Sequence, residues 1–156
     1  MARENHSILD PETGTLWGIL TKGTDLMEGI LQQCEHHGIE AGQVTCIGSL
    51  DEAYYVHGVE GPDGKPAYSD PITFRGPMEI LNGTGFLCRD ESGRLDLHFH
   101  GLVVDKQGQI LGGHFIKGKN PVLITLEFTV NTGKGIRAVR SFDPELGFPV
   151  INYKRK

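Results

Sequence analysis

Polar and apolar residues alternate in short runs along most of the chain, and one segment departs from this pattern. Between residues 25 and 37, apolar residues recur at the spacing of one helix face, at Leu26, Met27, Ile30 and Leu31. Thr24 or Asp25 can cap the start of this helix, and Gly38 lies just past its end. The pattern predicts a single principal helix over about residues 25–37.

The remaining apolar runs are short and separated by turn residues, which is typical of β-strands. We expect strands at residues 16–20, 44–50, 53–56, 72–74, 78–81, 85–88, 95–104, 110–116 and 122–130. Residues 1–14 are expected to form a loose N-terminal arm, and residues 143–156 a tail that wraps a sheet edge or a neighbouring subunit. The sequence therefore predicts one α+β domain over residues 15–142, a mainly antiparallel sheet with one helix.

Composition narrows the class of protein. The 156 residues fit one domain, and 15 basic against 20 acidic residues give a net charge of −5. This balance argues against a surface built throughout to neutralise phosphates, although a local basic patch stays possible. Residues 154–156 form the one basic cluster, which we interpret as a solvated tail. No apolar run is long enough to cross a bilayer, so we expect no membrane association.

Three cysteines, Cys34, Cys46 and Cys88, are widely spaced and form no CxxC pair. Their odd number favours reduced thiols packed in the core. The first residues contain no apolar stretch of the kind found in secretory signals. Together these features favour a cytoplasmic protein.

The segment LHFHGLVVDKQGQILGGHF, residues 97–115, holds three histidines that could share one site. Alternate residues of a strand share a face, so His98 and His100 point the same way, with Asp96, Leu102 and Val104. The opposite face of this strand carries a core-like set: Leu95, Leu97, Phe99 and Val103. Residues 105–109, DKQGQ, fit a hairpin whose three-residue loop ends at Gly108 in the left-handed conformation.

In that hairpin the numbers of paired residues sum to 214, which places His100 opposite His114. A loop of two or four residues would move His114 to the other face and destroy the site. The apolar pattern supports the register of the three-residue loop, because Leu111 and Phe115 then join the core face. A bulge at Gly112 and Gly113 could still shift the pairing.

Three neutral imidazoles with a fourth position left open are typical of a catalytic zinc site, and imidazole also suits iron, copper and nickel. Gly112 and Gly113 leave room for a water molecule or a ligand beside His114. The alternative is that the three histidines are ordinary strand residues bonded to neighbouring strands or to another subunit. We expect His98, His100 and His114 to bind a divalent metal, with zinc as the first candidate.

Several motifs occur in one order: GTDL at residues 23–26, GSL at 48–50, GPMEIL at 76–81, HFH at 98–100, GGH at 112–114 and LEF at 126–128. In this order they resemble the PPC domain (plants and prokaryotes conserved) over roughly residues 15–142. The resemblance implies an α+β fold, a homotrimer and a stand-alone domain of the bacterial or archaeal kind. The fold is also similar to that of acetolactate decarboxylase, which holds zinc with an HxH pair and a further histidine.

Proteins that this sequence resembles are often described as DNA-binding. In plants the domain follows AT-hooks, whose Arg-Gly-Arg-Pro core enters the minor groove. The present sequence contains no such core, and its acidic balance further weakens the case for nucleic acid.

Three functions stay open at this point. The first is a trimeric module that binds protein or nucleic-acid partners, the second a zinc-dependent hydrolase or decarboxylase, and the third a sensor whose small-molecule ligand enters at the open metal position. An enzyme needs an acid or base near the metal, for which Glu79, Asp96 and Glu127 are candidates. Asp96 shares the histidine face and could orient an imidazole. We also expect the site to lie near a subunit boundary.

Overall fold

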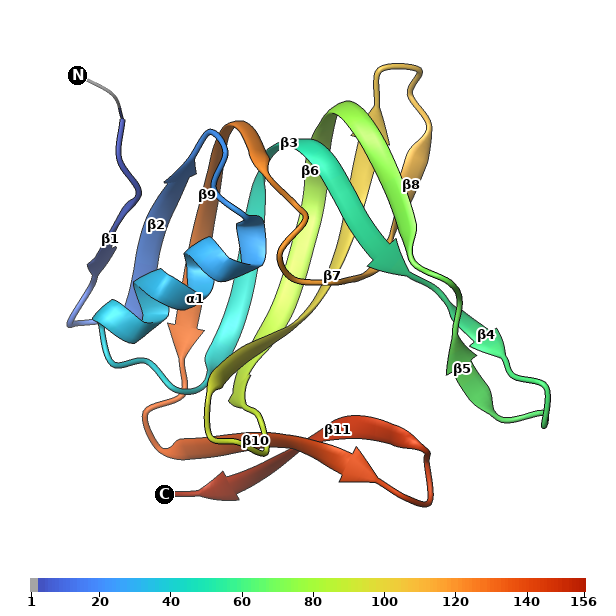
Figure 1. Ribbon diagram of the computed structural model, residues 1–156. Coiled ribbons are helices and arrows are strands. Elements are labelled where there is room, and N and C mark those ends of the chain that lie inside the picture. Colours follow the sequence, from blue (N-terminus) through green and yellow to red (C-terminus); the bar gives the residue numbers. More distant parts are fainter. Residues whose placement is uncertain (1–2) are drawn as a thin grey trace.

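One helix and a large, mainly antiparallel sheet make up the chain (Figure 1). The computed structural model describes residues 3–156. Its elements are β1 (His6–Leu9), β2 (Thr15–Thr21), α1 (Leu26–His36), β3 (Gly42–Val56), β4 (Gly58–Glu60), β5 (Pro66–Tyr68), β6 (Ile72–Arg89), β7 (Leu95–Asp105), β8 (Ile110–Phe115), β9 (Val122–Thr132), β10 (Ile136–Asp143) and β11 (Phe148–Arg155). The predicted α+β class is confirmed.

The main sheet has nine strands in the order β1-β2-β9-β3-β8-β7-β6-β10-β11. Strand β3 also pairs with β6, so β3, β6, β7 and β8 form a closed ring. The short β4–β5 hairpin projects from the end of β3, and the β10–β11 hairpin crosses beneath the sheet (Figure 1). The two hairpins and the ring together surround the histidine site described below.

The helix begins where the sequence predicts. Asp25 is its N-cap: Oδ1 accepts hydrogen bonds from the backbone amides of Met27 at 3.1 Å and Glu28 at 3.0 Å. The other carboxylate oxygen accepts from the amide of Asn120 at 2.7 Å, which ties the helix start to the loop before β9. Helix α1 packs against β2, β7 and β9 through its apolar side. It is too short to cross a membrane, and it is the one helix of residues 3–156.

Strands β3 and β6 are longer than predicted. The expected pieces 44–50 and 53–56 belong to the single strand β3, and 72–74, 78–81 and 85–88 belong to β6. Register shifts between β3 and β6, at Cys46/Gly48 and Leu50/Glu52, explain the difference. A β-bulge bends a strand and strengthens its twist without ending it. Turn-like residues in these segments therefore mark bends.

Both ends of the chain are more regular than expected. Within the predicted loose arm, β1 pairs with β2, with His6 opposite Ile19; residues 1–2 lie outside the described part. The predicted tail contributes β11, which pairs with β10 in a hairpin that joins β6 through one parallel pair, Val139 with Arg89. These ends form strands because each meets an unpaired sheet or hairpin edge.

The core lies on the helix side of the sheet and inside the ring. Leu95, Leu97, Phe99 and Val103 are buried, as the alternation along this strand predicts. Along β9 the same alternation would bury Ile124 with Val122 and Leu126, but the Ile124 side chain is 69% exposed. The pairing of β3 with β9 shifts between Gly48 and Leu50, next to Ile124, and this irregularity breaks the alternation.

Candidate metal centre

The β7–β8 hairpin has the predicted register. Gly108 adopts φ 79°, and the amide of Asp105 donates to the carbonyl of Gln109 at 3.1 Å. The Asp105 side chain fixes the loop by accepting from the amides of Gln107 and Gln109, both at 2.8 Å. His100 lies directly opposite His114, and the pairing continues to Val104 opposite Ile110 with no bulge at the glycine pair.

The glycines beside His114 allow neighbouring strands to approach closely. A Cβ atom on Gly112 would lie 2.0 Å from the carbonyl oxygen of Gly101, and one on Gly113 would lie 2.5 Å from that of Val56. Gly112 also has φ +149°, which side chains rarely adopt. The Nε2 of His57 donates to the Gly112 carbonyl at 2.9 Å. Gly112 and Gly113 thus hold β8 close to both of its neighbours, with His114 in the register that the site needs.

The three imidazoles converge on one point. Nε2 of His98 and Nε2 of His100 are 3.2 Å apart, and Nδ1 of His114 lies 3.3 Å from Nε2 of His100. All three nitrogens lie within 4.8 Å of one another. His100 is exposed, whereas His98 and His114 are half-buried.

These separations match those of a metal site. Nitrogens bound at about 2.0–2.1 Å to a tetrahedral zinc ion are about 3.3–3.4 Å apart. Direct hydrogen bonds explain the cluster less well, because His100 Nε2 has either one N–H or one lone pair, and that single group would have to serve both neighbours. Three neutral imidazole donors fit zinc and also suit iron, copper and nickel. The donor set leaves at least one coordination position for a water molecule or a ligand.

The surroundings keep the imidazoles neutral, as metal ligands must be. Burial, followed by the charges of Arg140 and His100, lowers the pKa of His98 to about 4. Burial and the charges of His98, Arg140 and His100 lower that of His114 to about 4. Burial, followed by the charge of Arg140, also lowers the pKa of His100. Near pH 7 the metal would therefore compete with few protons.

These shifts predict a pH dependence of the metal-free protein. Between about pH 6.5 and pH 4, unfolded chains would protonate His98 and His114 while folded chains keep them neutral. The unfolded state then binds more protons, so the free energy of unfolding should fall as the pH falls through this window. Urea unfolding in EDTA at pH 7.5 and pH 4.5 measures the loss. A variant with all three histidines changed to Gln should lose less stability, and an equal loss would contradict the prediction.

The structure places the other predicted site residues at different distances from the histidines. Asp96 lies on the same strand face and pairs with Lys117 and Arg140, each at 3.6 Å. Its charge opposes the lowering of the pKa of His98 and His114. Asp96 therefore acts on the imidazoles through its charge, and it makes no hydrogen bond to them in the structure.

Glu79 and Glu127 lie elsewhere on the sheet. Glu79 is exposed, although its neighbours Met78 and Ile80 are buried, and it lines a hollow with Ser49 and Ile124. Glu127 lines another hollow with Trp17 and Thr45. Neither hollow is lined by a histidine, so the structure does not bring these two carboxylates together with the three imidazoles.

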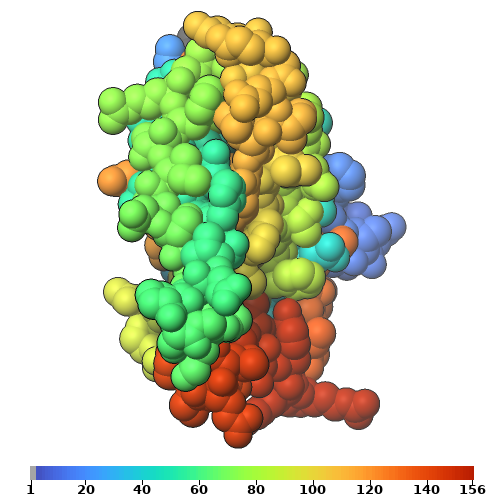
Figure 2. All heavy atoms as spheres, turned by 90° about the vertical axis from the view of Figure 1, so that its right-hand side faces the viewer, coloured from blue at the N-terminus to red at the C-terminus, as the bar shows by residue number. Residues whose placement is uncertain are grey.

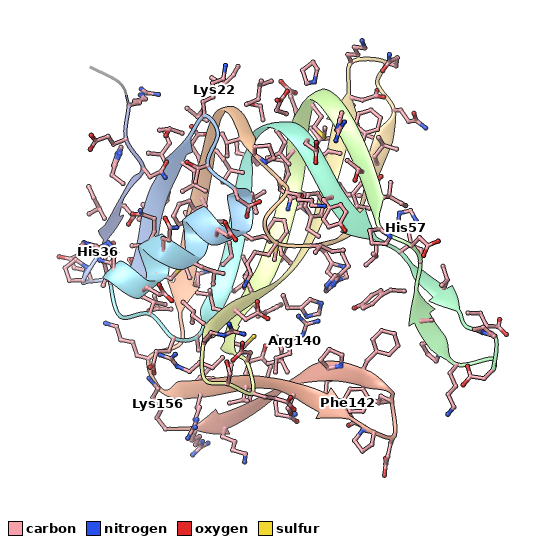
Figure 3. The ribbon with its side chains drawn as sticks, viewed as in Figure 1. Lys22, His36, His57, Arg140, Phe142 and Lys156 are labelled. Carbon is pink, nitrogen blue, oxygen red and sulfur yellow. The ribbon has the colours of Figure 1, made fainter. Side chains whose placement is uncertain are left out.

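Two residues that the sequence did not suggest lie beside the histidines. The Tyr68 ring stands 5.0 Å from that of His114 and meets the Phe148 ring edge-on at 4.9 Å. Arg140, on β10, rises toward the main sheet (Figure 3). The two hairpins that carry Tyr68 and Phe148 lie against each other in the space-filling view (Figure 2). No sequence motif signals either contact, because both depend on how distant hairpins pack.

One hollow adjoins the cluster at His100, and a second lies beside Asp96. One, of about 350 Å³, is lined by His100, Gly112 and Gly113, together with Asn82, Thr84, Gly101 and Leu102. The other, of about 400 Å³, is lined by Asp96 and Arg140, together with Asp90, Glu91, Ser92, Arg94, Phe142 and Pro149. The centre therefore has open space along the sheet at His100, and further space lies beside Asp96 and Arg140 near the C-terminal hairpin.

Residues 13–134 match the model of the Plants and Prokaryotes Conserved (PCC) domain. The chain belongs to the PCC domain family. This family is the PPC domain named in the sequence analysis, and the match covers β2 to β9, including all three histidines of the candidate centre. No curated protein sequence shows a significant match to the chain.

Solved structures share the fold over nearly the whole chain. A "putative DNA binding protein" from Bacteroides thetaiotaomicron is 25% identical with a TM-score of 0.80, over 98% of this chain and 100% of that one. A second protein of that description, from Ralstonia eutropha, is 28% identical with a TM-score of 0.78, over 94% of each chain. A "metal-containing protein" from Archaeoglobus fulgidus is 22% identical with a TM-score of 0.74, over 96% and 98%.

Proposed function

We propose that this PCC-domain protein is a homotrimer in which each chain binds one divalent transition metal, with zinc as the expected ion, at His98, His100 and His114. The observation that carries the proposal is the convergence of three imidazole nitrogens, at 3.2 Å and 3.3 Å, on one face of one hairpin. The metal would supply Lewis acidity at its open position. The chain supplies the three neutral imidazoles, the β7–β8 hairpin that holds them, and the guanidinium of Arg140.

The trimer is supported by apolar side chains left uncovered on the histidine face of the sheet. Cross-strand pairs run from Trp17 through Thr129, Thr45 and Thr84 to His100, so these side chains share a face. Five apolar side chains of this face are 41–60% exposed: Trp17, Ile47, Phe86, Leu102 and Ile110. Contiguous apolar surface of this kind favours contact with another protein. Further copies of the chain are the occupants that the family resemblance implies, and they would bring a subunit boundary near the histidines.

Native mass spectrometry of untagged protein tests both parts at once. The expected assembly contains three chains of 17.1 kDa and about one metal ion for each chain. A variant with all three histidines changed to Ala should keep three chains and lose the metal. A wild-type protein without metal, or a variant that keeps it, would refute the metal site. A monomeric wild type would refute the trimer alone.

Nucleic-acid binding is a second candidate, favoured by a local feature of the C-terminal hairpin. Arg137 lies directly opposite Lys154, and both line a hollow with Asn152 and Tyr153. Like charges facing each other across a hairpin are unfavourable unless an anion lies between them. The net charge of −5 opposes broad binding, so any binding should be confined to this hairpin and should weaken with salt. Fluorescence anisotropy with duplex DNA at two salt concentrations tests this candidate.

An enzyme that uses the open metal position is the alternative to a binding module. The positions of Glu79 and Glu127, away from the histidines, leave Asp96 as the nearest predicted carboxylate. A sensor that binds a small molecule at the same position needs no acid or base. The buried thiols of all three cysteines agree with the cytoplasmic location proposed from the sequence.

A further inference from the structure

Arg140 has hydrogen-bonding capacity that the chain does not use. Its side chain is 14% exposed, and its Nε is a buried donor with no partner among the described residues. Its one ion pair, from Nη1 to Asp96, is 3.6 Å long, beyond a normal hydrogen bond. A buried guanidinium carries five N–H donors, and leaving them unsatisfied is costly. The side chain is therefore poised for an acceptor that the chain itself does not supply.

Arg140 is also directed at the metal centre. Its Nη1 lies 3.6 Å from Oδ2 of Asp96, and Asp96 shares the strand face of His98 and His100. It lies on the face of β10 that looks toward the main sheet (Figure 3). An acceptor bound to Arg140 would thus lie on the same side of β7 as the coordination position that the three histidines leave open.

The adjoining hollow can hold a small organic molecule. Its volume is about 400 Å³, and it combines the guanidinium of Arg140 with the apolar side chains of Phe142 and Pro149. Ligand sites with one charged anchor and apolar walls are common at this size. Its link to the metal centre is Asp96, two residues before His98 on the same strand face, so a ligand held by Arg140 has space there for its carbon chain.

We propose that Arg140 and a metal ion held by His98, His100 and His114 together bind the carboxylate of a small organic acid. This inference rests on the metal site proposed above. Arg140 would hold the carboxylate through its planar pair of donors, which match a carboxylate in geometry. Arg140 is thereby the anchor that selects the ligand, while the histidines hold the metal.

The charges around the hollow favour a carboxylate over a phosphate. Both anions suit an arginine, but three carboxylates, those of Asp90, Glu91 and Asp96, line this hollow against the two guanidinium groups of Arg94 and Arg140. Asp96 already offsets part of the charge of Arg140 and Lys117. These carboxylates repel a dianion such as phosphate more strongly than a carboxylate with one negative charge. The site is therefore built for an anion with a single negative charge at its head.

The test uses the full chain loaded with Co²⁺, whose visible absorption reports changes in its ligands. Acetate and, separately, inorganic phosphate are titrated into wild type, Arg140→Gln and Arg140→Lys. Acetate should change the wild-type spectrum and bind more tightly than phosphate. Arg140→Gln should weaken acetate binding by about tenfold or more, because a charge-assisted pair of hydrogen bonds is lost, while Co²⁺ uptake is unchanged. Arg140→Lys should restore part of the affinity.

Matched variants separate this inference from the metal site and from folding. Arg75→Gln removes an arginine that is 80% exposed and outside the hollow, and it should leave acetate binding unchanged. If Arg140→Gln does not fold, the double variant Asp96→Asn/Arg140→Gln removes both charges and takes its place. Absent Co²⁺ uptake by the wild type would refute the metal site. Normal uptake with no acetate response, equal acetate affinity in the Arg140 variant, or tighter binding of phosphate would overturn the carboxylate inference alone.

Discussion

His100→Ala is expected to reduce bound zinc from about one ion per chain to almost none while the fold is retained. His100 is central because its Nε2 lies within 3.3 Å of a nitrogen of each of the other two histidines. The two remaining imidazoles would not hold the ion at stoichiometric levels. The fold should survive because His100 is exposed, and Phe99 and Phe115 still pack on the opposite face. Elemental analysis and near-ultraviolet circular dichroism measure the two effects.

His36→Ala is the matched control, since His36 ends α1 at an exposed position away from the hairpin (Figure 3). It makes the same chemical change and should leave the zinc content as in wild type. Full zinc occupancy in the His100 variant would mean that the three imidazoles do not share one ion.

Phe99→Ala is expected to lower the free energy of unfolding by about 3–5 kcal/mol. Phe99 is fully buried and meets the ring of Phe115 edge-on at 5.6 Å. Its ring also fills the space left by Gly83, where a Cβ atom would lie 2.4 Å from Cζ of Phe99. Removing the aromatic side chain would leave a cavity. The closed ring formed by β3, β6, β7 and β8 cannot easily contract to fill it. Urea unfolding of the metal-free protein measures the loss.

Phe142→Ala provides the comparison, because Phe142 is 57% exposed on β10 (Figure 3). Its loss should change the stability by about 0.5 kcal/mol or less. A similarly small effect at Phe99 would mean that the core and histidine faces of β7 had been interchanged.

The candidate site was predictable from sequence where its geometry is local. A three-residue loop, a glycine at its left-handed position and strict alternation were enough to place His100 opposite His114. The helix followed in the same way from its apolar spacing and its cap at Asp25. In each case the deciding interactions lie within about 20 residues.

Features that depend on distant segments were missed. The continuity of β3 and β6 rests on pairing with each other through bulges, which the sequence of neither strand reveals. Arg140 pairs with Asp96 on the histidine face only because β10 crosses beneath the sheet after a single pairing with β6. Tyr68 arrives on a separate hairpin. Their side chains carry no local pattern that indicates the site.

The location of all three histidines on one hairpin has a consequence for the order of folding. The ligands are separated by 2 and 14 residues along the chain, so their contacts close short loops and can form early. Arg140 lies 26 positions beyond His114 and depends on the last hairpin to dock. We expect a folding chain to capture its metal before the C-terminal hairpin is in place. The ability to choose an anion would then be acquired last, when β10 and β11 close beneath the sheet.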